Sequence, residues 1–265
     1  MVETTIKLIE WLNKGKISYS YFPSVSFGCS CALLELNKVL PVQTDYCKAH
    51  LYDRSDIDYL ILNLNLIKFK KIVKFKLGVN NIIKDGLNIN SLFKLVPKLK
   101  VRLDINRKWT LFQAKLFAKC IDLDNRNRID FIEEPCRTTE ESLEFAKETC
   151  INIAWDESVR EANFIVKKQH KVSAIIIKPM LMGSLAYCQF LIEKSRFIGL
   201  QSIISSSFES SFGLTQLSRI SYWLTPGVTP GLDTISLIKT QLLRSWPGCN
   251  IPIQKLDNLK LIWES

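Results

Sequence analysis

The sequence predicts an α/β fold of the (β/α)8-barrel type, and two observations carry that prediction. First, short apolar or β-branched runs recur along the middle of the chain, and subtracting the numbers of the last residues of seven of them gives spacings of 28, 29, 23, 22, 27 and 28. Second, segments with apolar residues three and four positions apart lie between these runs, as in amphipathic helices. One strand, one helix and two short loops need a stretch of about this length, so each interval is one βα unit.

An earlier and weaker unit, with a strand at residues 49–52 and a helix at 56–65, brings the number of expected strands to eight. The expected strands are residues 49–52, 72–76, 101–104, 129–133, 151–156, 174–178, 203–205 and 230–233. Eight successive units favour a barrel over an open doubly wound sheet. Such a sheet would carry a glycine-rich phosphate loop after its first strand, and no G-x-G-x-x-G occurs in the sequence.

Apolar faces define the helices between the strands. They consist of Leu111, Ala114, Leu116, Phe117 and Ala118, of Leu143, Phe145 and Ala146, and of Leu185, Tyr187, Cys188, Leu191 and Ile192. Residues 1–47 do not follow the period. Thr4 is a candidate N-cap for a helix through Gly15, and a second amphipathic stretch runs from Ser24 to about Val39. We therefore expect a helical capping module at 1–47, a barrel with the active site at 48–234, and a C-terminal segment at 235–265 that packs back on the capping module.

The composition excludes several classes of protein. With 47% hydrophobic and 23% charged residues, the chain has enough apolar surface to fold, and its apolar runs are too short to span a membrane. The net charge of +10 comes from scattered lysines, which argues against nucleic-acid binding. Eight cysteines without a C-x-x-C pair, two histidines and no secretory signal predict a cytoplasmic protein with reduced, buried thiols. We expect a monomer or weak homo-oligomer without a membrane or nucleic-acid partner.

Charged residues end five successive strands: Lys76, Asp104, Glu133, Asp156 and Lys178. Barrel enzymes place their active sites at the carboxyl ends of the strands, so these side chains should meet at one mouth. Three neighbouring carboxylates repel one another unless a cation lies between them, and an oxygen-only ligand set favours Mg²⁺, for which Mn²⁺ can substitute. A single such residue would be read as a solvated charge, but five in succession make that interpretation improbable.

Several motifs together resemble the enolase superfamily and, more narrowly, its o-succinylbenzoate synthase family of bacterial menaquinone biosynthesis. They are K-F-K at 74–76, R-L-D-I-N-R at 102–107, F-I-E-E-P-C at 131–136, A-W-D-E-S at 154–158, I-K-P at 177–179, S-S-S-F-E-S-S at 205–211, G-L-T-Q at 213–216 and P-G-L-D-T at 230–234. The resemblance covers nearly the whole chain, from about Thr4 to Trp263. It implies an enolase-superfamily barrel with a partial, N-terminally truncated α+β capping domain.

The resemblance also implies roles for the site residues. Asp104, Glu133 and Asp156 match the three Mg²⁺ ligands of the family, and Glu134 is their neighbour rather than a ligand. Lys76 matches the catalytic acid/base that acts as proton donor, and Lys178 matches the lysine on the opposite face, a proton acceptor that stabilises the dianion. The substrate-binding residues would be Lys74, Arg102, Ser205, Ser206 and Ser207.

The implied activity is that of a hydro-lyase acting on a small-molecule carboxylate. It is the Mg²⁺-dependent syn dehydration of 2-succinyl-6-hydroxy-2,4-cyclohexadiene-1-carboxylate to 2-succinylbenzoate. Two alternatives stay open: an N-acylamino acid or dipeptide racemase or epimerase with the same two lysines, and a decayed, inactive homologue. The P-G-L-D-T and S-S-S-F-E-S-S segments favour the first activity.

The match departs from the family at two places. The family's capping domain begins with antiparallel strands that carry a mobile loop over the substrate, whereas this sequence starts at the following helix. Met180 and Met182 also replace the small polar residues that the family tends to have after Lys178. A late start codon and gene decay would both explain the first departure. From it we expect an open barrel mouth and apolar surface around Ile6, Ile9 and Trp11.

Overall fold

The structure is a computed structural model that describes residue 6 and residues 9–13, 22–44, 46–52, 57–66, 71–78 and 81–261. The chain divides into two compact units. We call the first the sheet unit; it consists of Lys48–Ile176 and Ser195–Ser202. We call the second the helical unit; it consists of Met1–Cys47, Ile177–Lys194 and Ile203–Ser265.

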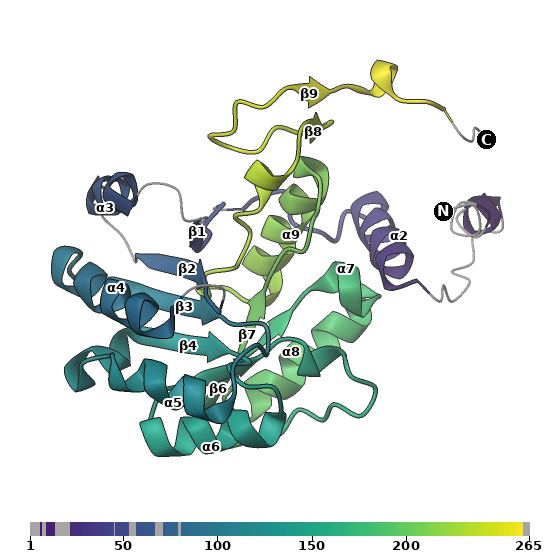
Figure 1. Cartoon of the computed structure of the whole chain (residues 1–265). Coiled ribbons are helices and arrows are strands. Elements are labelled where there is room, and N and C mark those ends of the chain that lie inside the picture. The colour runs from purple at the N-terminus through teal and green to yellow at the C-terminus, as the bar shows by residue number, and fades with distance from the viewer. Residues whose placement is uncertain are drawn as a thin grey trace. The chain divides into compact units, whose positions relative to one another are not determined.

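Seven strands follow one another in chain order in one sheet (Figure 1). They are β1 (His50–Tyr52), β2 (Ile72–Lys76), β3 (Lys100–Asp104), β4 (Ile129–Glu133), β5 (Ile153–Trp155), β6 (Val172–Ile177) and β7 (Gln201–Ile204). Each strand from β1 to β5 pairs in parallel with the next. The parallel α/β prediction is confirmed, and β2 and β4 have the predicted bounds.

The eighth predicted strand, at residues 230–233, is wrong as a strand. Only Gly231 pairs there, in a single parallel bridge with Ser205. Its backbone N–H donates to Ile204 O and its carbonyl accepts from Ser206 N, both at 2.9 Å. The residue before this bridge is Pro230. Because proline has no backbone N–H, it cannot donate a further hydrogen bond that would lengthen the pairing. A separate parallel pair forms later, between β8 (Gln241–Leu242) and β9 (Ile253–Gln254).

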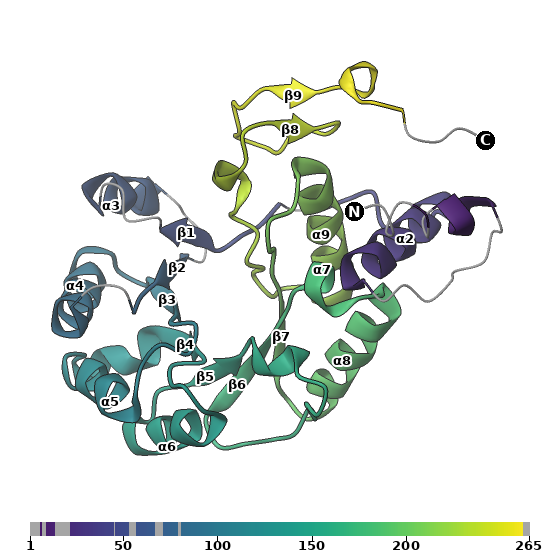
Figure 2. The same ribbon diagram turned by 45° about the vertical axis from the view of Figure 1, so that its right-hand side comes forward.

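Helices follow the strands of the sheet unit and form an outer row beside them (Figure 2). They are α3 (Ile57–Leu66), α4 (Ile82–Leu95), α5 (Leu111–Lys119) and α6 (Thr139–Thr149), with 3-10 turns at Leu123–Arg128 and Ser158–Arg160. Side chains of Asn81, Thr110 and Thr138 cap α4, α5 and α6 by accepting backbone N–H groups of the first turns. Because Phe117 and Phe145 are fully buried, the predicted apolar faces at 111–118 and 143–146 are confirmed, and they hold these helices on the strands. In the third predicted face Cys188, Leu191 and Ile192 are buried, but Tyr187 is 44% exposed, so the prediction is wrong for that side chain.

The remaining helices are α2 (Pro23–Leu36), α7 (Pro179–Met182), α8 (Leu185–Phe197) and α9 (Ser211–Leu224), with 3-10 turns at Ile235–Leu237 and Leu256–Asn258. Within the helical unit, α9 holds the end of α2 and the segment after it. The Arg219 guanidinium donates to the Glu35 carboxylate and to Leu40 O, the latter at 2.9 Å. Arg244 also pairs with Glu35, at 3.2 Å. Charge-assisted hydrogen bonds from Arg219 thus bind this segment to α9, and Arg244, which follows β8, adds a second bond to Glu35.

The expected first helix is described only in part. Ile6 and residues 9–13 are helical, whereas the proposed caps Thr4 and Gly15 lie outside the described residues. Ile6 is 52% exposed, as expected, but Trp11 is buried, so the expectation of exposed apolar surface is wrong for that side chain.

All eight cysteines are free thiols. Burial raises the pKa of Cys31, Cys136 and Cys188 to about 12, as expected for inert core thiols, although Cys31 and Cys136 also have charged neighbours that contribute. Cys47 and Cys150 are exposed, however, so the expectation of buried thiols holds for only part of the set. Among the described helices, none combines the length and the apolar character that crossing a bilayer requires.

Candidate active site

The carboxyl ends of β2, β3 and β4 lie in register. Lys76 pairs with Asp104, and Asp104 pairs with Glu133. Glu133 pairs in turn with Ala154, two residues before Asp156. Because side chains alternate along a strand and parallel strands end at the same edge, the sheet unit presents these four charged residues at one edge.

Lys74 forms the centre of a buried ionic cluster at that edge. Its Nζ donates to Glu133 Oε2 at 2.6 Å and lies 3.0 Å from Asp104 Oδ2. Lys74 lies two positions before Lys76 and on the same side of β2. Its long side chain extends towards the carboxyl ends of the neighbouring strands and reaches Asp104 and Glu133. Burial alone would lower the pKa of Lys74, but the Glu133 and Asp104 carboxylates raise it above its usual range. Lys74 is therefore a permanent ammonium group in this cluster.

The three carboxylates crowd one another even with Lys74 between them. Burial raises the pKa of Glu133 to about 7; the charge of Lys74 opposes this rise, whereas those of Asp104 and Asp156 add to it. Lys74 contacts Glu133 and Asp104, and the Arg160 guanidinium lies 3.9 Å from Asp156 Oδ1, but Arg160 is itself partly exposed to solvent. Three buried carboxylates therefore share a single buried ammonium, in a region that water reaches poorly. A further cation bound there would lower the free energy of the ionised site.

The donor set suits a hard divalent cation, since it consists of carboxylate oxygens at the carboxyl ends of three successive strands, with Asp156 directly after β5. In the part of the chain that the structure describes, no three Asp, Glu, His or Cys side chains are arranged so that they could hold a metal ion as they stand. The Lys74 ammonium lies between Asp104 and Glu133 and sets their present spacing. The chemistry of the three carboxylates thus fits Mg²⁺, whereas the distances between them are those of carboxylates paired with the Lys74 ammonium.

The two lysines with predicted catalytic roles occupy different units. Lys76, at the end of β2, is exposed and belongs to the sheet unit. Lys178 directly follows β6, belongs to the helical unit and takes the N-cap position of α7 without a capping bond from its side chain.

The predicted serines lie after β7, in the helical unit. Ser205 Oγ and Ser206 Oγ both donate to Gly231 O, at 3.2 and 3.0 Å, and Ser206 Oγ also shares a hydrogen bond with Thr234 Oγ1 at 2.9 Å. Ser207 N donates to Glu209 Oε2 at 2.6 Å. These bonds connect the S-S-S and P-G-L-D-T motifs. The close approach needs glycine at 231, because a Cβ there would lie 2.8 Å from Ser205 Oγ.

Replacing Gly231 with alanine is therefore expected to displace the Ser205 hydroxyl and raise KM about tenfold or more, the cost of one disturbed polar contact of about 1.4 kcal/mol. Steady-state kinetics would measure this. Gly28→Ala is the matched control, because a Cβ at Gly28 meets no atom within 4 Å. Unchanged KM in Gly231→Ala would argue against Ser205 as a substrate contact.

Arg102 has a different environment from Lys74. Its Nε donates to Asp130 Oδ2 at 2.9 Å, and its guanidinium lies over the Phe131 ring at 5.0 Å from the centroid. Asp130 is the second residue of β4, near the amino end of that strand. The structure thus brings Lys74 to the carboxylates and pairs Arg102 with Asp130.

Sequence reasoning missed a second group of polar residues beside the carboxylates. Glu134, taken as a mere neighbour of Glu133, is buried and bonded to Arg107 and to Ser158. The only signal in the sequence was a charged residue directly after a strand end.

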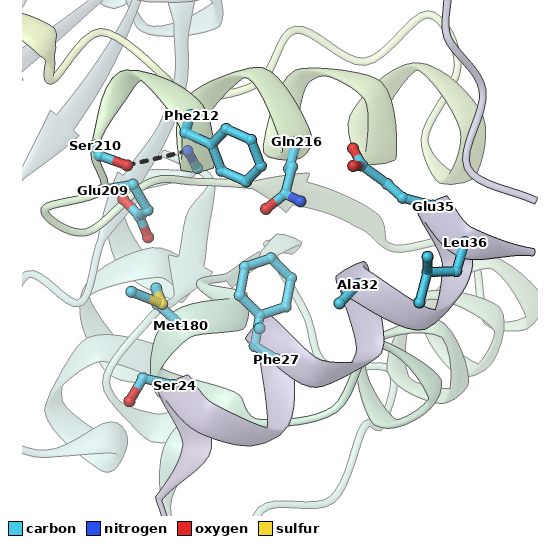
Figure 3. Close-up of a pocket in the computed structure, with 12 residues that line it drawn as sticks. Ser24, Phe27, Ala32, Glu35, Leu36, Met180, Glu209, Ser210, Phe212 and Gln216 are labelled. Carbon is cyan, nitrogen blue, oxygen red and sulfur yellow. Dashed lines mark hydrogen bonds between the residues drawn. The ribbon is translucent and has the colours of Figure 1, made fainter. Parts of the chain in front are cut away.

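A cavity of about 670 Å³ lies within the helical unit, between α2, α7 and α9 (Figure 3). Phe27, Met180 and Phe212 give it apolar walls, and Glu209 lies at one end. Burial raises the pKa of Glu209. None of the predicted site residues lines this cavity.

No family model matches the chain. Among solved structures, the muconate lactonizing enzyme from Pseudomonas putida is similar with a TM-score of 0.65 and 17% identity over 89% of this chain and 69% of that one. The L-Ala-D/L-Glu epimerase from Bacillus subtilis is similar with a TM-score of 0.62 and 18% identity over 82% and 64% of the two chains. The chain therefore shares the α/β fold of these enzymes, in which helices accompany a parallel sheet that curls into half of a barrel.

Curated relatives narrow this class. The chain is 52% identical to the o-succinylbenzoate synthase of Proteus mirabilis over 92% of this chain and 76% of that protein. It is 48% identical to the o-succinylbenzoate synthase of Yersinia enterocolitica over 98% and 80% of the two chains. The chain belongs to the o-succinylbenzoate synthase family. It is accordingly a lyase, of a family that serves menaquinone biosynthesis.

Proposed function

We propose that the chain catalyses the Mg²⁺-dependent syn dehydration of 2-succinyl-6-hydroxy-2,4-cyclohexadiene-1-carboxylate to 2-succinylbenzoate. Membership of the synthase family supports the reaction. The observation that carries the metal dependence is the crowding of Asp104, Glu133 and Asp156 around one buried ammonium. We also propose that the protein acts in the cytoplasm, as a monomer or weak homo-oligomer, with the division 1–47, 48–234 and 235–265 described above.

Asp104, Glu133 and Asp156 would hold the Mg²⁺ ion. When bound, Mg²⁺ supplies positive charge that stabilises the negative charge developing on the substrate carboxylate as the neighbouring proton leaves. Burial is the main cause of the raised pKa of Glu133, and repulsion from Asp104 and Asp156 adds to it; a bound cation would relieve that repulsion. Lys74 would keep its charge beside the carboxylates and limit how far they separate.

Lys76 would act as the acid/base. In its neutral form it would accept the ring proton, and as an ammonium it would return a proton to the leaving hydroxyl on the same face, which accounts for the syn course. Its exposed position at the strand end leaves it accessible to a substrate. Lys178 would hold the dianion electrostatically, and Ser205, Ser206, Ser207 and Arg102 would bind polar groups of the substrate. Loss of water makes the ring aromatic and supplies the driving force.

Racemisation or epimerisation of N-acylamino acids or dipeptides is the second candidate, because paired lysines also suit 1,1-proton transfer. The identity of about half to named synthases favours dehydration. An inactive, decayed homologue is the third. One set of assays separates the three candidates: a dehydratase forms the aromatic product, a racemase or epimerase changes the optical rotation of an N-acylamino acid or dipeptide, and an inactive homologue does neither.

Removing divalent cations with a chelator is expected to stop turnover, and adding Mg²⁺ or Mn²⁺ should restore it, because oxygen-only sites accept both ions. The appearance of the aromatic product would be followed by its ultraviolet absorbance. Undiminished turnover after exhaustive chelation would contradict the metal dependence. Restoration by Zn²⁺ but not by Mg²⁺ would contradict the hard-cation assignment.

A further inference from the structure

The carboxylate of Glu134 is the hub of a buried hydrogen-bond network at the end of β4. Glu134 is 1% exposed. Its Oε1 accepts from the backbone N–H groups of Asp156, at 2.9 Å, and of Ser158, at 2.6 Å. Its Oε2 accepts from Ser158 Oγ, at 3.2 Å, and from Arg107 Nε. One side chain therefore holds the backbone of the segment that begins at Asp156.

Arg107 extends this network to the segment after β3. Its backbone N–H donates to Glu134 O at 3.0 Å. Its Nη2 donates to Ser158 Oγ at 2.6 Å and pairs with Glu161 Oε1 at 2.7 Å. The segments that follow β3, β4 and β5 are thus joined through the side chains of Arg107, Glu134 and Ser158, all within the sheet unit.

The backbone at these positions is unusual for residues with side chains. Glu134 has a φ of +35°, and Asn106 and Arg107 have φ values of +49° and +57°. Such left-handed conformations cost free energy outside glycine and persist where surrounding bonds enforce them. The turn after β4 directs two adjacent carboxylates to different partners: Glu133 to Lys74 and Glu134 to the backbone after β5.

We propose that Glu134 is a positioning residue that fixes Asp156 beside Asp104 and Glu133 and thereby sets the affinity of the site for its divalent cation. Asp156 is charged in the same sense as its two neighbours, so repulsion would move its segment away if that segment were loose. The bond from Asp156 N to Glu134 Oε1 opposes this movement. Groups that orient metal ligands in this way typically change metal affinity when they are removed. The inference rests on the proposed metal site and adds a residue to it.

The test is Glu134→Gln, measured on the whole purified chain without substrate. The glutamine oxygen can still accept from Asp156 N, but its amide N–H groups would face the N–H of Arg107. We expect Mn²⁺ affinity, measured by titration calorimetry and by electron paramagnetic resonance, to fall about 10–100-fold. Turnover should fall at limiting Mg²⁺ and recover towards the wild-type kcat at saturating Mg²⁺. Glu148→Gln, which removes an exposed carboxylate from α6, is the control and should leave Mn²⁺ affinity unchanged.

A lower melting temperature with unchanged Mn²⁺ affinity would show a merely structural role and overturn the inference, while leaving the metal site standing. If the wild-type chain binds no Mn²⁺, the proposed metal site fails and the inference fails with it. Ser158→Ala removes a single hydroxyl from the network and provides the test if Glu134→Gln does not fold. A smaller loss of Mn²⁺ affinity in this variant supports the inference, and no loss overturns it.

Discussion

Replacing Lys76 with alanine is expected to lower turnover about 10²–10⁴-fold, the usual contribution of a positioned acid or base. Lys76 is proposed to handle both proton transfers, so no other group takes over its role. The fold and Mg²⁺ binding should persist, because Lys76 is exposed at the strand end and the buried cation among the carboxylates is Lys74. Single-turnover kinetics with saturating Mg²⁺ would isolate the chemical step from metal binding.

Lys84→Ala is the matched control for this experiment, since it removes an exposed lysine from α4. Lys74→Ala is the informative comparison. It removes the ammonium group between Asp104 and Glu133. We expect it to change metal affinity more than it changes the rates of proton transfer. If Lys76→Ala keeps more than about a tenth of wild-type turnover, against the factor expected for acid–base catalysis, the role assigned to Lys76 is wrong.

Replacing Glu133 with glutamine is expected to have the largest effect on metal binding. It converts one of three proposed ligands to a neutral amide, so the loss of Mn²⁺ affinity should exceed the factor of about 10–100 that supporting residues contribute. Turnover should fall accordingly and should not recover at accessible Mg²⁺ concentrations. Titration calorimetry and steady-state kinetics across Mg²⁺ concentrations would measure both.

Glu134→Gln is the counterpart of this variant, because it changes the adjacent carboxylate and should respond to added Mg²⁺. Equal and irreversible effects at both positions would mean that the strand register is off by one residue, since neighbours along a strand point to opposite sides.

The metal-free Glu133→Gln protein should remain folded. Burial is the main cause that raises the pKa of Glu133 to about 7. Stability contributed by its protonated form is therefore present below the ordinary carboxyl pKa and is lost as the pH rises through about 7. At pH 8 the neutral amide should make the metal-free variant at least as thermostable as the wild type. A collapse of its melting temperature would instead attribute the loss of activity to unfolding.

Local patterns were sufficient for most of the sheet. β2 and β4 begin and end at the predicted residues, and α3 lies within one residue of its predicted bounds. The strands are β-branched runs, and the helices have apolar residues three and four positions apart. Both patterns depend only on residues that are close together in the sequence. The segment at 230–233 has a strand-like composition but forms no strand. Gly231 pairs only with Ser205, which is distant in the sequence, and the preceding Pro230 has no N–H to donate.

The candidate site was less predictable in its details. The strand-end positions of Asp104 and Glu133 follow from the period, and the structure places them in register. Lys74 and Lys76 differ by two positions, so they share a side of β2 and the sequence cannot rank them by face. The two lysines differ in their surroundings because the strand register and the length of the side chain decide which groups each can reach. In the structure it is the Lys74 ammonium that reaches the carboxylates, 2.6 Å from Glu133.

The sequence by itself determined the family, the α/β class, the order of the βα units and the residue types at the strand ends, because each of these is encoded by residue identity and short-range spacing. Only the tertiary structure decided which cation lies among the carboxylates, that Arg102 pairs with Asp130, and that Glu134 holds the backbone of Asp156 and Ser158. Those contacts join residues 22 to 59 positions apart. Their formation depends on the register between strands and on turns with left-handed backbone, which no local pattern of side chains specifies.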